Sequence, residues 1–204
     1  MNYLAHLYLS GDDEDVLLGN FIGDYVKGKK YLEFPETIQK GILLHRQIDY
    51  FTDANLYFRE AKLLLRNDYG LHSGIVIDLF YDHFLAKNWP VYSNSSLRDF
   101  AKKAHAILLS RFFYLPKRVQ GFLPFLIQHK RLESYATTEG IQKTLEIMGR
   151  YTSLPEKSAK AIEILKENLD FLEINFFCFM NEMFEFVSQT HQIQIKRPDR
   201  VAGL

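Results

Sequence analysis

Two acids and an imidazole interrupt an apolar stretch, "IDLFYDHFLAKNW", at residues 77–89. Water solvates an unpaired carboxylate far better than hydrocarbon does, so a buried helix with two acids needs compensating partners. At 100° per residue, Asp78 and Asp82 share one strip of a helix with Trp89, whereas His83 lies about 100° further round. The opposite side is also apolar, which predicts a helix that is covered on most of its circumference.

The same anomaly recurs at three other places in the chain. His45 and Asp49 are spaced i, i+4 among aliphatic residues, and Arg46 occupies an adjacent face. Asn20 and Asp24 align on an earlier helix, and His6 stands alone in the apolar "YLAHLYL". Four separate segments therefore each direct acids or imidazoles toward a core.

These groups allow two interpretations. In the first, each is an ordinary hydrogen-bonded feature of the interior, which is the commoner fate of a single buried polar group. In the second, several converge on one or two divalent cations at the centre of a helical bundle. We favour the second, because four segments contribute and because mixed oxygen and imidazole ligands suit Mn²⁺, Mg²⁺ or Fe²⁺. The predicted ligands are His6, Asp24, His45, Asp49, Asp78 and Asp82.

The elements that must position these groups are predicted to be helices throughout. Apolar spacings of three or four residues prevail, and the chain has only 6 prolines and 11 glycines. Helix starts are expected at Asp12 or Asp13, at Pro35-Glu36, at Ser73 and at Ser95 or Ser96, with Pro90 ending the third helix. Further helices are predicted over about 118–133, 138–148 and 155–188. No repeat or linker divides the chain, so we expect one compact all-α bundle over 1–204, with a polar tail from about 191 that is loose.

The composition restricts the class of protein. Lys plus Arg and Asp plus Glu number 25 each, so the overall charge does not favour nucleic acid or an anionic membrane as the main partner. The single Cys178 cannot form an internal disulfide, and the amino-terminal residues lack the pattern of a secretory signal. No apolar run reaches 18 residues, which argues against a membrane span. A cytoplasmic protein is expected.

Five motifs resemble one known family. In order along the chain they are "MNYLAHLYLS", "GNFIGDYVKG", "GILLHRQIDYFTD", "DLFYDHFLAKNW" and "LESYATTEGIQKTLEIMGRY". This order, from residue 1 to about 151, resembles the acyl carrier protein phosphodiesterases, also called acyl carrier protein hydrolases. The resemblance implies an all-helical enzyme, distantly related to the HD-domain phosphohydrolases, that converts holo acyl carrier protein to the apo carrier and 4'-phosphopantetheine with Mn²⁺ or another divalent ion.

The resemblance also carries over a set of motif residues, whose individual roles are our own inference. The chain has His45-Arg46 and the reversed Asp82-His83 in place of an ordinary His-Asp pair, so it departs from the HD pattern. Arg46 is expected to bear phosphoryl charge, and His83 or Asp53 to act as general acid or to orient water. Asn20, Lys27 and Trp89 are expected to contact the substrate. The family's motif positions are His6, Asn20, Asp24, His45, Arg46, Asp49, Asp53, Asp78, Asp82 and His83.

An acidic carrier protein requires local basic surface on a chain of zero net charge. One candidate patch lies just beyond Asp24, and the other spans residues 111–131; ordinary solvated faces explain both equally simply. The patches comprise Lys27, Lys29 and Lys30, and Arg111, Lys117, Arg118, Lys130 and Arg131. Two other functions stay open: hydrolysis of a nucleotide or another small phosphoester by the same metal site, and a non-enzymatic helical interaction module.

Overall fold

A computed structural model describes residues 1–198, and within that range every regular element is a helix. The prediction of an all-α chain is therefore confirmed. The helices are α1 Tyr3–Tyr8, α2 Glu14–Ile22, α3 Glu36–Ala54, α4 Leu56–Tyr69, α5 Ser73–Lys87, α6 Trp89–Tyr92, α7 Leu97–Ser110, α8 Lys117–Gln128, α9 Arg131–Ser134, α10 Thr138–Tyr151, α11 Ser158–Glu167 and α12 Leu169–His191. Short 3₁₀ turns are η1 Gly23–Tyr25, η2 Gly28–Glu33, η3 Gly70–His72 and η4 Phe112–Tyr114.

Side chains that accept hydrogen bonds from free backbone N–H groups begin three of the predicted helices, α2, α7 and α10. Asp13 accepts from the first turn of α2, and Ser96 accepts from the backbone N–H of Asp99 in α7. Asn55 separates α3 from α4 and caps the latter, where the sequence had suggested Thr52 or Asp53. The third predicted helix, α5, ends at Lys87, just before Pro90.

Two predicted helices are each interrupted in the structure. The 118–133 segment breaks after α8, because Lys130 takes a left-handed conformation with φ 47° before α9 begins. The 155–188 segment breaks at Asn168, whose φ of −118° ends α11 while its side-chain amide donates to the carbonyl of Ile164. Both breaks reorient the chain at a single residue, which helical periodicity does not reveal.

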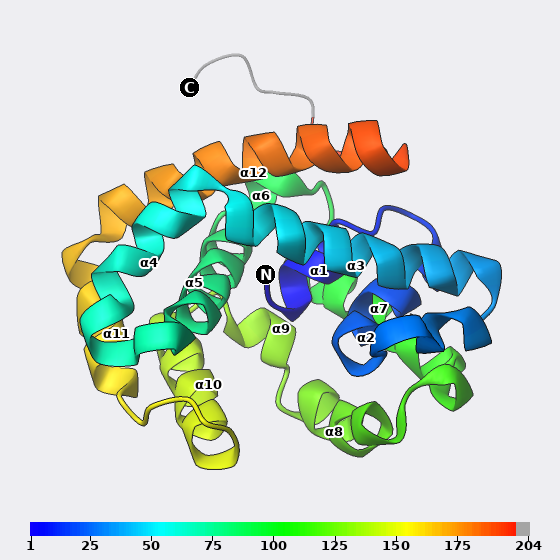
Figure 1. Cartoon of the computed structure of the whole chain (residues 1–204), viewed down its shortest axis with the longest axis horizontal. Helices are drawn as coiled ribbons and strands as arrows, with labels where there is room; N and C mark the ends of the chain where they lie inside the picture. The colour runs from blue at the N-terminus through cyan, green and yellow to red at the C-terminus, as the bar shows by residue number, and fades with distance from the viewer. Residues whose placement is uncertain (199–204) are drawn as a thin grey trace.

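Helix α5 lies in the middle of the structure and contacts α1, α4, α10 and α12 (Figure 1). Its side chains Val76, Leu79, Phe80 and Phe84 are fully buried, so the prediction of a helix covered on most of its circumference is confirmed. The long helix α12 runs along one side beside α3 and α4, where aromatic residues from these helices and α5 form much of the core (Figure 1). Burial of these large side chains is the main stabilising term.

Helices α2 and α3 approach each other unusually closely. A Cβ built on Gly19 would overlap the carbonyl of Ile38 and lie 2.9 Å from the Cα of Gly41. Only glycine lets two helix backbones come so near, so this contact sets the position of every α2 side chain relative to α3.

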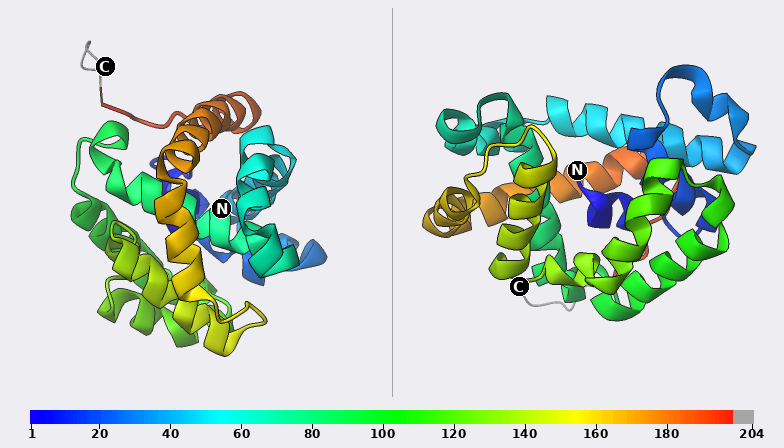
Figure 2. Two further views of the ribbon diagram at one scale, coloured as in Figure 1. Left: turned by 90° about the vertical axis from the view of Figure 1, so that its left-hand side faces the viewer. Right: turned by 90° about the horizontal axis from the view of Figure 1, so that it is seen from below.

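Seen from below, α1 lies between α8 and α10 (Figure 2, right).

Candidate metal centre

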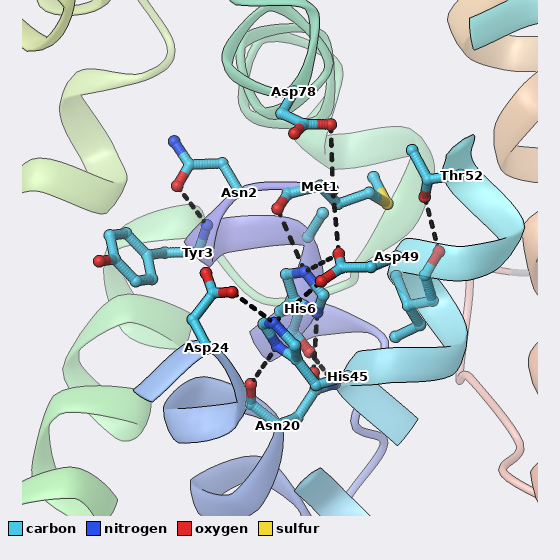
Figure 3. A network of polar contacts seen from close by, with 12 residues as sticks. Met1, Asn2, Tyr3, His6, Asn20, Asp24, His45, Asp49, Thr52 and Asp78 are labelled. Carbon is cyan, nitrogen blue, oxygen red and sulfur yellow. Dashed lines mark hydrogen bonds and ion pairs between the residues drawn. The ribbon is translucent and has the colours of Figure 1, made fainter. Parts of the chain in front are cut away.

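Two histidines and an aspartate from α1 and α3 converge on one point (Figure 3). The Nε2 atom of His6 lies 3.2 Å from Oδ1 of Asp49, and the Nε2 atom of His45 lies 3.1 Å from Oδ2 of the same carboxylate. The two imidazole rings stack, with centroids 3.9 Å apart. Both histidines are buried, and one ligand atom from each of the three residues lies within 4.8 Å of the other two.

Asn20, fully buried on α2, orients both imidazoles. Its side-chain carbonyl lies 2.8 Å from Nδ1 of His6, and its backbone carbonyl accepts from Nδ1 of His45 at 2.7 Å. A backbone carbonyl cannot donate, so Nδ1 of His45 carries a proton and the lone pair of the neutral ring lies on Nε2. This is the arrangement in which a second residue holds the tautomer that binds a metal.

Two further acids lie at the edge of the group. Oδ1 of Asp24, in η1, is 3.5 Å from Nε2 of His45, and its side chain is 66% exposed. Oδ1 of Asp78, on α5, lies 3.0 Å from the amino group of Met1, which is also 3.5 Å from Asp49 (Figure 3). Both carboxylates border the same space as the two histidines.

The electrostatics separate the two histidines. Burial disfavours the charged form of His45, but hydrogen bonds to Asp24 and Asp49 outweigh it and raise its pKa to about 9. Burial and the nearby charge of His45 lower the pKa of His6 to about 4. Burial opposes ionisation of Asp49, yet hydrogen bonds from both histidines hold its pKa well below its usual range. At neutral pH the group therefore contains a carboxylate, one imidazolium and one neutral imidazole.

This donor set fits a divalent cation. Nε2 of His45 is enclosed and lies 3.1 Å from Asp49 and 3.5 Å from Asp24, so its imidazolium proton occupies the position between carboxylates that a cation would take. Two imidazoles and a carboxylate are sufficient protein ligands for a catalytic metal that keeps open positions for water and substrate. His6, His45 and Asp49 would hold the ion, and Asp24 and Asp78 are near enough to join them.

The group opens into a cavity of about 520 Å³. The polar end is formed by α1, α2, α3 and α5, and the opposite wall by side chains of α8 and α10. That wall is mostly apolar: besides Arg118, Thr144 and Tyr151, it contains Phe122, Phe125, Leu126, Ile147 and Met148. The cavity therefore joins the candidate metal group to a mostly apolar wall.

Asp82 differs from its predicted role. It is fully buried and accepts hydrogen bonds from the backbone N–H groups of Leu4 and Ala5 at 2.8 and 3.0 Å, so it completes the N-terminal cap of α1 that Asn2 begins. Although it shares a strip of α5 with Asp78, its oxygens are occupied by α1 one turn away from the metal group. Asp82 positions the helix that carries His6.

The remaining predicted residues lie outside the cavity lining. The guanidinium of Arg46 donates to the carbonyls of Val26 and Gly28, and Nδ1 of His83 bonds to the carbonyl of Tyr135. The indole of Trp89 donates to the carbonyl of Ser95 within an aromatic cluster. Asp53 is 78% exposed on α3, and Lys27 is exposed at the start of η2.

Sequence reasoning missed three residues of the cavity. Tyr3 and Tyr25 line it with their hydroxyls 2.7 Å apart. Arg131 was assigned to a surface patch, yet its side chain is only 6% exposed and lines the cavity. A basic residue directly before an apolar helix turn gives no sequence signal of this burial.

The described part of the chain contains no helix long and apolar enough to cross a membrane. No solved structure matches the chain significantly, so the distant relationship to HD-domain enzymes stays a prediction.

Comparison with known proteins identifies the family. The family model described as acyl carrier protein phosphodiesterase matches residues 1–183. Relatives of that name include one from Yersinia pestis, 36% identical over 149 residues, covering 72% of this chain and 77% of the relative. Another, from Yersinia enterocolitica, is 32% identical over 196 residues, covering 96% of this chain and all of the relative. A third, from Serratia proteamaculans, is 30% identical over 186 residues, covering 91% and 96%. The chain therefore belongs to the acyl carrier protein phosphodiesterase family.

Proposed function

We propose that this chain hydrolyses the phosphodiester that joins 4'-phosphopantetheine to the serine of holo acyl carrier protein. The observation that carries the proposal is that the His6, His45 and Asp49 group adjoins a cavity with a mostly apolar wall. The substrate has the same division, because a phosphodiester is followed by a flexible arm with a gem-dimethyl group and methylene units. The names of the relatives support the same activity.

His6, His45 and Asp49 would hold a divalent cation, for which Mn²⁺ is the expected identity. When bound, such an ion supplies Lewis acidity toward phosphoryl oxygens and lowers the pKa of water toward about 7. Asn20 then serves to fix the orientation of both imidazoles, whose Nε2 atoms point toward Asp49, rather than to contact the substrate. In the reaction, water adds its oxygen to phosphorus, and the serine oxygen of the carrier leaves with a proton.

The tyrosine pair supplies a donor for the substrate. Tyr3 and Tyr25 share one hydrogen bond between two hydroxyls, so one O–H remains free to donate to a phosphoryl oxygen. Burial raises the pKa of both phenols, which keeps them protonated at neutral pH. Asp24, the exposed carboxylate beside His45, is the group best placed to accept the proton of an attacking water.

Carrier docking is assigned to the basic residues that follow Asp24. We call them the mouth lysines, and they are Lys27, Lys29 and Lys30. All are exposed and none forms an ion pair with another described residue, so their charge is available to an acidic protein. Arg118, exposed above the ring of Tyr25 at 5.8 Å, extends positive charge to the cavity edge. Such charges raise the association rate and make it dependent on salt.

The test is incubation of holo acyl carrier protein with the chain and Mn²⁺, followed by mass spectrometry of the carrier. We expect loss of the phosphopantetheine mass, its suppression by a chelator, and its suppression in Asp49→Asn. The control Asp170→Asn makes the same change at an exposed carboxylate of α12 and should retain release.

Full release by Asp49→Asn would overturn the assignment of the metal group. Turnover of a nucleotide or a simple phosphodiester, with holo carrier left intact, would overturn the proposed substrate and favour the small-phosphoester alternative.

A further inference from the structure

Arg131, the first residue of α9, is a buried cation with almost no partner. Only 6% of it is exposed, and it is one of the residues that line the cavity. Its one hydrogen bond to a described side chain runs from Nη1 to Oγ1 of Thr144 and is long, at 3.4 Å. A guanidinium carries five N–H donors, so most of them have no protein acceptor.

The surroundings of Arg131 do not neutralise its charge. No carboxylate of residues 1–198 forms an ion pair with it. The aromatic ring of Phe125 lies 5.0 Å from its Cζ atom, and Tyr135 is its other close neighbour. Burial lowers the pKa of Arg131, the direction expected for a guanidinium that has no carboxylate beside it. Burying an unpaired charge destabilises a protein, so the position needs a reason outside the fold itself.

The unbonded donors face the cavity. None of the guanidinium nitrogens is among the fully enclosed polar atoms that lack a partner, and the residue lines the same space as His6 and His45. A ligand in the cavity can therefore reach Arg131 without any movement of the backbone. The two features of the cavity that could bind a phosphoryl group lie on different helices, with the candidate metal group on α1 and α3 and Arg131 on α9.

We propose that Arg131 is an anion-binding residue that receives the phosphoryl oxygens of the ligand in this cavity. A planar guanidinium binds two oxygens of a phosphate at once, and the ligand's negative charge supplies what the protein lacks. An amide carbonyl of the arm would satisfy a donor but would leave the charge uncompensated. The identification of the anion as 4'-phosphopantetheine rests on the proposed function, whereas the anion site itself rests on the burial and missing partner of Arg131.

Other arginines near the cavity are less suitable. Arg46, the sequence-based candidate for phosphoryl contact, donates to two backbone carbonyls and stacks 5.2 Å from the ring of Tyr31, outside the cavity. Arg118 borders the cavity but is exposed, where water competes for its donors. Arg131 alone among these three combines burial with free donors inside the cavity.

The experiment measures binding of inorganic phosphate and of 4'-phosphopantetheine to the metal-free protein by calorimetry, in a chelator. We expect Arg131→Met to lower the affinity for both ligands by about 10-fold to 100-fold, as loss of a charge-assisted hydrogen-bonded pair does. Arg98→Met, which removes an exposed arginine of α7, should bind both as the unchanged protein does. Without ligand, Arg131→Met should melt at the same or a higher temperature, because an apolar side chain replaces an unpaired buried charge.

Unchanged phosphate affinity in Arg131→Met, or no phosphate binding by the unchanged protein, would overturn the proposal. If Arg131→Met does not fold, Arg131→Gln keeps a polar partner for Thr144 without the charge, and the same loss of affinity is expected of it. A lower melting temperature with unchanged affinity would show a structural role instead. The binding measurement involves neither metal nor turnover. Its result therefore stands even if the chain fails to release phosphopantetheine from holo carrier. If Arg131→Met lost phosphate affinity as expected but bound 4'-phosphopantetheine as weakly as the unchanged protein does, the identification of the ligand would be refuted.

Discussion

Metal affinity should decrease about tenfold for each pH unit below about 9, because a single proton competes with the ion. Nδ1 of His45 donates to the carbonyl of Asn20, so the second proton of the imidazolium is on Nε2, the atom that a metal needs. Asp24 and Asp49 hold that proton and raise the pKa of His45 to about 9. Each ion that binds at neutral pH must therefore release one proton.

The magnitude follows from that pKa. Apparent affinity scales with the fraction of His45 that is neutral, so it is lower than its high-pH limit by about 10-fold at pH 8, about 100-fold at pH 7 and about 1000-fold at pH 6. The loss at pH 7 corresponds to about 3 kcal/mol. His6, with its pKa lowered to about 4, stays neutral in this range, and Asp49 and Asp24 stay ionised. A plot of log affinity against pH should have a slope close to one.

Calorimetric titration of Mn²⁺ between about pH 6 and pH 8, in buffers of different ionisation enthalpy, measures both affinity and protons released. We expect about one proton per ion at pH 7. A slope near two would mean that both histidines are charged before binding, and a slope near zero would mean that His45 is already neutral. Either result would refute the electrostatic asymmetry of the two rings. NMR titration of the metal-free protein gives an independent reading of the two histidine pKa values.

Three further changes test the supports of the site. Gly23→Ala should lower the affinity for Mn²⁺ by at least about tenfold and the free energy of unfolding by about 1–3 kcal/mol, because a Cβ there overlaps the ring of His45. A Cβ on Gly121 meets no other atom, so the control Gly121→Ala should change neither quantity. Asp82→Asn should lower the free energy of unfolding in urea by about 1–3 kcal/mol, since it removes one acceptor from the start of α1. Reversing the mouth lysines to glutamate should raise KM for holo carrier without changing kcat, and the same reversal at Lys102 and Lys103 should have no effect.

The helical class and most helix starts could be predicted from the sequence because they depend on local chemistry. Asp13 and Ser96 cap their own helices, and α5 ends at Lys87, just before the Pro90 that lies in the first turn of α6. The helix break at Asn168 could not be foreseen, because apolar residues at helical spacing continue on both sides of it and tertiary packing decides the direction of each half.

The residues of the candidate site could be predicted from the sequence only in part. Polar residues at helical spacing on apolar faces correctly indicated which segments meet, and the structure brings His6, His45 and Asp49 together. Asp78 and Asp82 have identical signatures in sequence, yet only Asp78 borders the cavity, because the start of α1 inserts beside Asp82. Which of two equivalent acids faces the metal group depends on a helix 70 to 80 residues away in the chain, and helical geometry on its own contains no such information.

The contact between α2 and α3 explains why the ligand group needs the whole fold. Gly19 and Gly41 let the two backbones touch, and Asn20 follows Gly19 directly, so the same contact places Asn20 against His45. Asn20 then holds His45 with its backbone and His6 with its side chain, which couples the third helix to the first. A larger residue at Gly19 would separate the helices, and both imidazoles would lose their common orientation. The candidate metal centre is therefore a consequence of helix packing around one asparagine, and the His-Asp spacing on α3 supplies only half of it.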